Sequence, residues 1–364
     1  MSQGLLLSLL MGAERMGVEN LAFRCALAAL TAFVVSLALG WRLIRALRRH
    51  GVIEDTSQPD HAALNAIQSE KRDVPTMGGL MILGGILAAL ALWADLGNGL
   101  VQIGVFCLLA LGVLGLADDA IKLSGAKSRG LRKRTKLLVQ CVVGAVAGVL
   151  ILLHADGREY ADRFYLPFTT WSFGMGVWYV LWTGFLIAAA SNAVNLTDGL
   201  DGLAGGCAGI AAAALLGFGC LVMRPGAWGG LSLPRVAGGE EMCVLAASVV
   251  GAALGFLWYN CHPAQIFMGD TGSLSLGGLL GFIALALKLD LLLFVTGLVL
   301  FADMLTVAMQ IASYKLTRRR IFPITPIHHY FQTYLRWPEQ KITVRLWIIA
   351  AVAVVASLAA LKLG

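Results

Sequence analysis

Ten runs of about 20 apolar residues follow one another along this chain, and they leave it few ways to fold. A helix that spans the hydrocarbon core of a bilayer needs about 20 predominantly apolar residues. Only 13% of the 364 residues are charged, whereas a soluble protein carries about 25%. We therefore predict an all-α polytopic integral membrane protein with a single domain, 1–364. The predicted spans are 21–40, 77–94, 100–117, 136–153, 174–194, 202–222, 243–259, 273–288, 291–313 and 343–361.

The basic residues indicate the orientation of these spans. Twenty of the 28 lysines and arginines fall in the segments 42–72, 122–136 and 315–345, which the span count places on one side. Cytoplasmic loops carry such an excess, so this side is predicted to be cytoplasmic and both termini to lie outside. Residues 1–11 carry no positive charge, so we expect a short apolar segment near the outer surface rather than a cleaved signal peptide. The basic residues border spans without interleaved aromatic residues, and no nucleic-acid partner is expected.

Five aspartates follow spans three, five and seven, again on the predicted cytoplasmic side: Asp118, Asp119, Asp198, Asp201 and Asp270. Ionisable groups at a membrane boundary are costly and usually mark function. Carboxylates also repel one another, so we expect a cation to hold them together if they converge. The hard oxygen ligands favour Mg²⁺. For Asp118 and Asp119 alone, a solvated helix end neutralised by Lys122 is the simpler alternative.

Three further polar segments surround these aspartates. In the stretch 192–202, Asp198 and Asp201 are three residues apart and would share a face at a helix start, although Asp198 alone would suit an N-cap. In the stretch 260–273, a glycine loop before a helix suits an anion, and Phe267 either stacks on a planar group or packs at the membrane edge. His328 and His329, in a basic loop, suit phosphate binding or proton transfer.

These motifs resemble the phospho-N-acetylmuramoyl-pentapeptide transferase family, within the polyprenyl-phosphate N-acetylhexosamine-1-phosphate transferase superfamily. The matching stretches are 75–79, 118–119, 192–202, 267–273 and 326–331, in the order of the family. The resemblance implies Mg²⁺-dependent transfer of phospho-N-acetylmuramoyl-pentapeptide from its UDP donor to undecaprenyl phosphate. UMP would be released and lipid I, a peptidoglycan precursor, would form. A homodimer in the bacterial cytoplasmic (inner) membrane is also implied.

The resemblance further implies roles for single residues. Asp270 would hold Mg²⁺, Asp118 would deprotonate or orient the lipid phosphate, and Asp119 would support it. His328 and His329 would lie near the diphosphate. The residues expected on the uridine side are Lys71, Asn195, Asp198, Asp201, Asn260 and Phe267. The expected substrate-binding set also includes Thr76, Lys122, Lys136 and Asn192.

The chain departs from the family pattern at one motif. The family has three consecutive histidines followed by Phe-Glu, whereas Tyr330 and Gln332 replace the third histidine and the glutamate here. A tyrosine hydroxyl does not titrate near neutrality, which leaves His328 and His329 as the candidates for acid–base work. Asp303 is a lone acid within the ninth span, and we expect it to face the bundle and pair with a neighbour.

Several alternatives remain open at this point. Two mechanisms are possible: the acceptor phosphate attacks the donor β-phosphate directly, or a carboxylate first forms a covalent phospho-sugar intermediate. We favour direct attack, because pre-positioning and charge neutralisation suffice to stabilise it. A sister enzyme would transfer N-acetylglucosamine-1-phosphate or another amino-sugar phosphate. A secondary transporter would place its ionisable groups near the bilayer midplane.

Overall fold

The computed structural model describes residues 20–50, 52, 74–124, 130–155, 160–166, 169, 171–223 and 233–361. Within this part, the chain forms a helical bundle with one short antiparallel hairpin, β1 (Arg163–Tyr165) and β2 (Ser172–Gly174). The helices are α2 (Leu21–Arg49), α4 (Gly79–Trp93), α5 (Gly99–Leu123), α6 (Lys133–His154), α7 (Trp178–Thr197), α8 (Leu203–Met223), α9 (Glu240–Asn260), α10 (Gly269–Ala286), α11 (Asp290–Thr296), α12 (Leu298–Thr317), α13 (Ile327–Thr333) and α14 (Glu339–Leu361).

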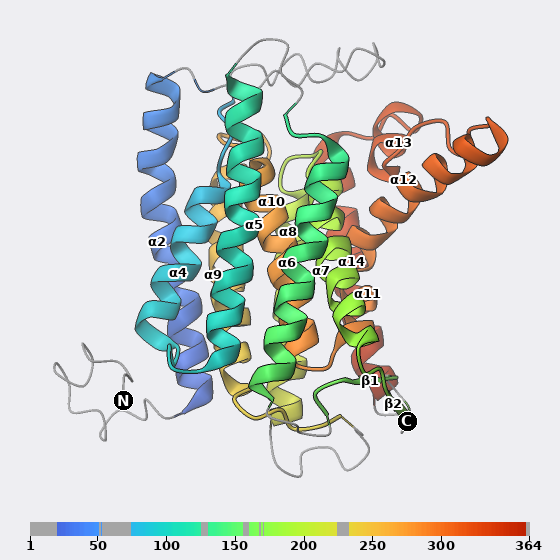
Figure 1. Ribbon diagram of the computed structural model, residues 1–364. Coiled ribbons are helices and arrows are strands. Elements are labelled where there is room, and N and C mark those ends of the chain that lie inside the picture. The colour runs from blue at the N-terminus through green and yellow to red at the C-terminus, as the bar shows by residue number, and fades with distance from the viewer. Residues whose placement is uncertain are drawn as a thin grey trace.

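The prediction of an all-α polytopic membrane protein is confirmed. Nine helices of the described part are long and apolar enough to cross a membrane, and α4 is a shorter apolar helix of 15 residues. Most of their bounds lie within a few residues of the predicted spans, but α2 and α5 continue past the predicted ends at 40 and 117, to Arg49 and Leu123. The helices alternate in direction, and α2 begins on the same side of the molecule as α14 ends (Figure 1). This arrangement agrees with an even number of crossings. The segment 1–11 lies outside the described residues.

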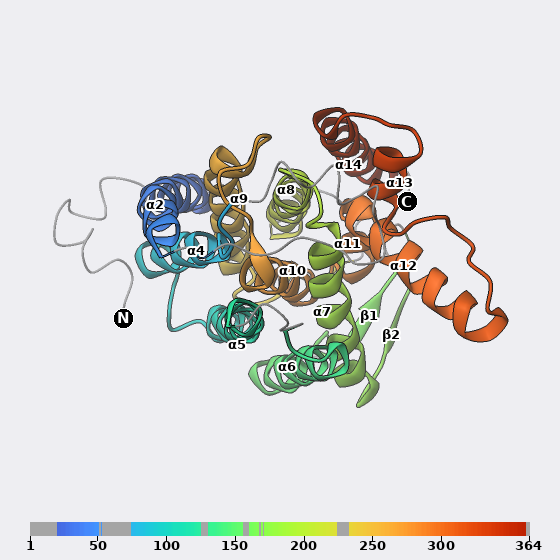
Figure 2. The ribbon, with the colours of Figure 1, turned by 90° about the horizontal axis from the view of Figure 1, so that it is seen from above.

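The ninth predicted span, 291–313, is not one continuous helix. It is divided into α11 and α12 at Gly297, which ends the first helix and begins the second. Phe294 and Phe301 pack across the break, with ring centroids 4.5 Å apart. Beyond the break, α12 leaves the bundle and projects sideways (Figures 1 and 2). Hydropathy alone does not reveal such a change of direction because both halves are apolar.

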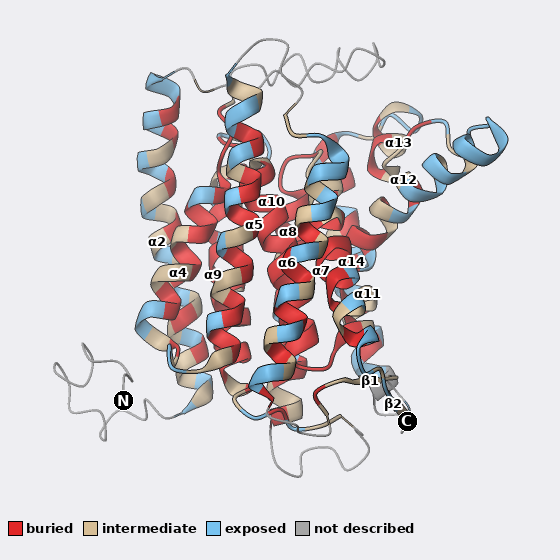
Figure 3. Cartoon of the chain, viewed as in Figure 1, coloured by how far each residue is buried: buried red, intermediate tan, exposed pale blue. Residues whose placement is uncertain are grey.

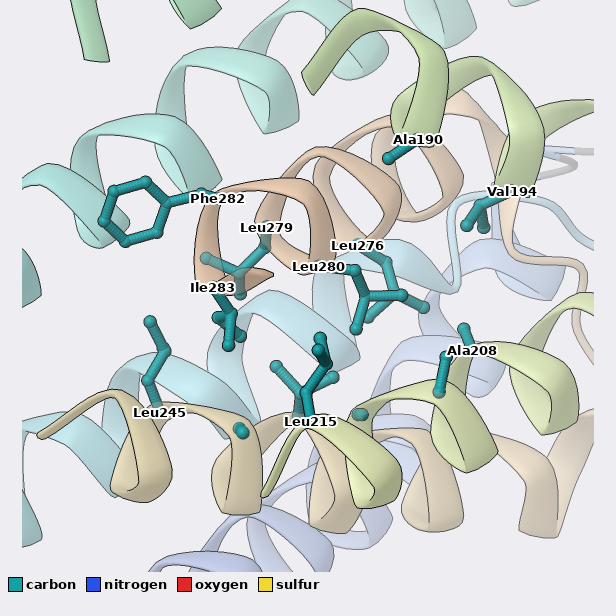
Figure 4. Packing of buried hydrophobic residues seen from close by; sticks show 14 of the residues in the cluster. Ala190, Val194, Ala208, Leu215, Leu245, Leu276, Leu279, Leu280, Phe282 and Ile283 are labelled. Atoms are coloured by element: carbon teal, nitrogen blue, oxygen red, sulfur yellow. The ribbon is translucent and has the colours of Figure 1, made fainter. Parts of the chain in front are cut away.

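Helix α10 occupies the centre of the bundle, among α4, α5, α7, α8 and α9 (Figure 2). In all, 94% of its 18 residues are buried, and the burial colours show the surrounding faces turned toward it (Figure 3). Leucine, phenylalanine and isoleucine side chains of α10 interdigitate with those of its neighbours (Figure 4). In lipid, such packing together with small residues replaces the hydrophobic drive between helices.

Glycines permit the closest helix contacts. A Cβ at Gly277 of α10 would overlap the backbone of Ala190 in α7, and a Cβ at Gly251 of α9 would overlap Ala29 in α2. Both glycines belong to small-residue pairs four apart in the sequence. This close packing fixes the register of α10, and with it the position of the polar residues at its first turn.

Candidate active site

Polar residues converge where α5 and α7 end and where α6, α8, α10 and α14 begin, at the upper end of the bundle in Figure 1. We call this end the upper face. Asp118 and Asp119 lie in the last turns of α5, and Asp270 lies in the first turn of α10. All three side chains are buried, and one carboxylate oxygen from each lies within 4.8 Å of the other two.

Asp119 is committed to the N-terminus of α10. Its Oδ1 accepts from the backbone N–H of Asp270 at 3.0 Å, and its Oδ2 accepts from the Thr271 N–H at 2.9 Å and the Thr271 hydroxyl at 2.7 Å. The first N–H groups of a helix have no partner within the helix and carry partial positive charge. Asp119 therefore caps α10 from another helix. Through these contacts it holds the first turn of α10, and with it Asp270, beside the end of α5.

Asp118 and Asp270 share the ammonium groups of two lysines. Lys136, in the first turn of α6, lies 3.2 Å from Asp118 Oδ2 and 2.5 Å from Asp270 Oδ2. Lys122 lies 3.1 Å from Asp118 Oδ2 and 3.3 Å from Asp270 Oδ1. Asp118 also accepts from the Leu131 N–H at 2.6 Å. We predicted that converging carboxylates need a cation; in this structure the lysine side chains supply that positive charge.

Asn195 ties α7 to the same cluster. Its side-chain amide donates to Asp270 Oδ1 at 2.9 Å and to the Ser273 hydroxyl at 2.8 Å. Asp198, one turn later, is the C-cap of α7, so the stretch 198–202 forms a turn between two helices. The expectation that Asp198 and Asp201 share a face at a helix start is therefore wrong. Gly202, at the end of this turn, has a φ of 75°, a left-handed conformation that glycine adopts without strain.

Asp201 belongs to a second cluster, so the five aspartates do not all meet. Its Oδ2 lies 2.9 Å from His262 Nδ1, and its backbone N–H donates to Glu339 at the start of α14. One ligand atom each from Asp201, His262 and Glu339 lies within 4.8 Å of the others. The cluster joins the turn after α7, the loop after α9 and the start of α14. We call it the latch.

The latch borders a cavity of about 750 Å³. Phe267 lines the same cavity and is half-buried, so two of the residues expected on the uridine side lie together there. Thr333, Arg336 and Trp337 also line it. The cavity thus offers an aromatic ring, carboxylates and a guanidinium on a rigid frame.

The structure also describes three other expected substrate-binding residues, and two of them hydrogen-bond to neighbouring protein groups. Asn260 is buried; it accepts from the Gly202 N–H and donates to the Ile266 carbonyl, bracing both loops. Asn192 donates to Gln140 Oε1 at 2.6 Å, between α7 and α6. Thr76 is buried near the α10 N-terminus, and its hydroxyl has no hydrogen-bond partner within the described structure. Lys71 lies outside the described residues.

His328 and His329 lie in the first turn of α13, and both are buried. Their rings are 4.2 Å apart, and His329 Nδ1 lies 3.2 Å from Gln332 Oε1. Asp303 pairs with His328, so the expectation that it faces the bundle and finds a partner is confirmed. Tyr330 stacks instead on Tyr334, with centroids 5.2 Å apart.

Sequence reasoning missed several partners that complete these clusters. Thr271 and Ser273 fall within a motif that we singled out, but their roles depend on which helix faces α10. Gln140 and Glu339 lie outside every motif that we singled out. An acidic residue directly after a proline at the start of a helix, as at Pro338-Glu339, is a signal for a helix N-terminus only.

Comparison with known proteins agrees with this geometry. A family model described as glycosyl transferase family 4 matches residues 101–288. The chain is 40% identical over 355 residues to the phospho-N-acetylmuramoyl-pentapeptide-transferase of Caulobacter vibrioides, covering 95% of this chain and 94% of that one. It is 39% identical over 369 residues to the protein of the same name from Gemmatimonas aurantiaca, covering 95% of each. The chain therefore belongs to glycosyl transferase family 4, as a member of its phospho-N-acetylmuramoyl-pentapeptide-transferase group.

Proposed function

We propose that this membrane enzyme transfers phospho-N-acetylmuramoyl-pentapeptide from its UDP donor to undecaprenyl phosphate. UMP leaves, and lipid I forms as a precursor of peptidoglycan. The observation that carries the proposal is the cluster of Asp118, Asp119 and Asp270 with Lys122 and Lys136 at one end of the bundle. Phosphoryl transfer depends mainly on positioning and on neutralising phosphate charge, and these groups supply both.

The two lysines are the proposed ligands of the donor diphosphate. Each bridges Asp118 and Asp270, and each side chain stays partly exposed, unlike that of Asp118. Their ammonium groups rotate on flexible stems and serve phosphate as compact point charges. The cavity beside Asp201 and Phe267 is the proposed uridine side, together with Asn195, Asp198, Asn260 and Lys71. His328 and His329 are proposed to lie near the diphosphate.

The residues present fit a divalent metal ion. Asp270 and Asp118 offer hard oxygen ligands that pair with the flexible Lys122 and Lys136 side chains. Both oxygens of Asp119, in contrast, accept from the first turn of α10. We propose Mg²⁺ on Asp270, with Asp118 close by. When bound, the ion would add positive charge where charge develops on the transferring phosphoryl oxygens.

We favour direct attack on the donor. An oxygen of the acceptor phosphate forms a bond to the β-phosphorus, and the bond from that phosphorus to the oxygen of UMP breaks. Asp118 orients the acceptor phosphate or takes its proton. The covalent alternative predicts that labelled UMP exchanges into the donor without any acceptor lipid; direct attack predicts no such exchange.

The location of the charged cluster argues against a transporter. The acids occupy helix ends at the upper face rather than the middle of their helices. Described basic residues, such as Lys133 and Arg134, lie at the same face, which we propose is cytoplasmic in the bacterial inner membrane. A homodimer is expected from the family resemblance, and light scattering of the purified protein would test it.

A UMP-release assay on the purified protein tests the function. Turnover should require the muramoyl-pentapeptide donor, undecaprenyl phosphate and Mg²⁺, and chelation should abolish it. The sister activity predicts instead that UDP-N-acetylglucosamine is the better donor. Asp270→Asn should insert into membranes normally yet lose turnover. Full turnover in that variant would remove Asp270 from the proposed metal role.

A further inference from the structure

A buried carboxylate and a buried imidazole form a pair at the side of the proposed site. His328 Nδ1 lies 2.8 Å from Asp303 Oδ2, and the His328 backbone N–H lies 3.4 Å from Asp303 Oδ1. Both side chains are 0% exposed. Asp303 belongs to α12 and His328 to α13, so this contact joins the projecting helix to the helix that carries both histidines.

The opposite edge of the His328 ring has a different environment. Nε2 is buried and has no hydrogen-bond partner within the described residues. It points at Gly199, because a Cβ added there would lie 2.5 Å from this nitrogen. A buried imidazole nitrogen that finds no partner among the described residues is a candidate for a partner from the substrate, since buried polar groups are otherwise hydrogen-bonded.

Gly199 connects this edge to the charged cluster. It follows Asp198 in the turn after α7, and Asn195, one turn earlier, donates to Asp270 at 2.9 Å. The His328 edge therefore faces the segment that reaches the proposed catalytic carboxylate. Packing alone would be served better by an apolar pair, because an acid within a membrane helix is costly to bury.

We propose that Asp303 is a positioning residue for catalysis, acting through His328. The carboxylate keeps a proton on Nδ1 whether the ring is neutral or charged, so Nε2 is the edge that exchanges a hydrogen bond or a proton with an oxygen of the donor substrate. The partner of Nδ1 thus fixes both the tautomer and the orientation of the ring. This inference rests on the proposed function for the identity of the substrate.

Asp303→Asn is the central variant, because asparagine offers one oxygen to the two N–H donors of His328. We expect kcat to fall by roughly 100-fold with the KM of the donor changed by less than about threefold, since ground-state binding is not the role. Asp303→Glu keeps a carboxylate and should recover most of kcat. Asp290→Asn is the matched control: Asp290 is also buried and accepts from a ring N–H, that of Trp182 at 2.8 Å. The Asp290 carboxylate lies in α11, away from the upper face. The kcat of the Asp290→Asn variant should therefore equal that of the wild type.

A second measurement does not depend on turnover. Nitrogen-15 NMR of the histidine-labelled full-length protein reports the tautomer of each ring, and His328→Asn identifies the relevant signal among the six histidines. We expect a protonated Nδ1 for His328 in the wild type and in Asp290→Asn, and loss of that state in Asp303→Asn. If the wild type shows this tautomer but no UMP release, the proposed function fails while the positioning of the ring stands.

Three results would overturn the inference. The first is native kcat in Asp303→Asn. The second is a loss of kcat in Asp303→Asn with an unchanged His328 signal. The third is an Asp303→Glu protein that has a native His328 signal but is as inactive as Asp303→Asn. Elution of each variant as a single species on gel filtration confirms that a folded protein is compared in every case.

Discussion

Substituting Asp119 by asparagine should destabilise the whole bundle rather than remove a catalytic group alone. The carboxylate accepts three hydrogen bonds from the first turn of α10, and it is 1% exposed. Asparagine keeps one acceptor oxygen, but its NH₂ group would face the N–H and O–H donors of α10, to which it cannot hydrogen-bond as an acceptor. Because α10 is the central helix, loss of hydrogen bonds at its first turn should weaken its packing against the neighbouring helices.

The expected magnitude follows from the bonds. A buried donor left without an acceptor costs about 1–3 kcal/mol, and Asp119→Asn leaves one or two of the three donors unpaired. Loss of a negative charge at a helix N-terminus adds roughly 0.5–1 kcal/mol. The free energy of unfolding should therefore fall by about 2–7 kcal/mol. Thr271→Val is a graded control: it removes only the hydroxyl bond at 2.7 Å and should cost about 1 kcal/mol.

The assay is reversible denaturant unfolding of the purified protein in detergent micelles, followed by circular dichroism, with UMP release measured in parallel. Both variants should unfold earlier than the wild type, and Asp119→Asn should unfold first. If Asp119→Asn unfolds together with the wild type, or if Thr271→Val is equally damaging, then Asp119 does not act as the cap of α10.

Three further variants test other contacts. Lys136→Gln should raise the KM of the donor and lower kcat by at least about tenfold. Lys133→Gln, at an exposed position of the same helix, should leave both constants unchanged. Equal kinetics in the two variants would exclude Lys136 from the site. Glu339→Gln should weaken the latch and raise the donor KM more than it lowers kcat, and an unchanged KM in steady-state kinetics would separate the latch from donor binding. Gly199→Ala should displace His328 and lower the rate of UMP release. Gly217→Ala should leave that rate unchanged, because a Cβ at Gly217 meets nothing within 4 Å. Normal turnover in Gly199→Ala would contradict the close approach of the His328 ring to Gly199.

The helices of this fold could be predicted from the sequence because a membrane helix needs about 20 apolar residues wherever it lies. The charged core of the site was also predictable, since acids at the ends of apolar runs stand out. The break at Gly297 was not, because glycine is common inside membrane helices and its neighbours are apolar on both sides.

Contacts between residues that are distant in the sequence were the second feature that could not be predicted. Asp201 was grouped with Asp198 because the two are three residues apart, but the turn after α7 sends Asp201 toward His262. Likewise, the family resemblance predicts that Asp119 supports Asp118, and only the position of α10 shows which donors it meets. Which polar residues share a site depends on helix order and rotation, and one sequence contains neither directly.

The lysines that bridge Asp118 and Asp270 have a consequence for the order in which ligands bind. Three carboxylates and two ammonium groups leave the resting cluster with a single net negative charge, so a lone divalent ion would find weak attraction and occupied oxygens. A nucleotide pyrophosphate that draws the ammonium groups toward itself would expose those oxygens and restore their negative field. Ion and nucleotide should thus promote each other's uptake, and each should bind poorly to a protein that lacks the other.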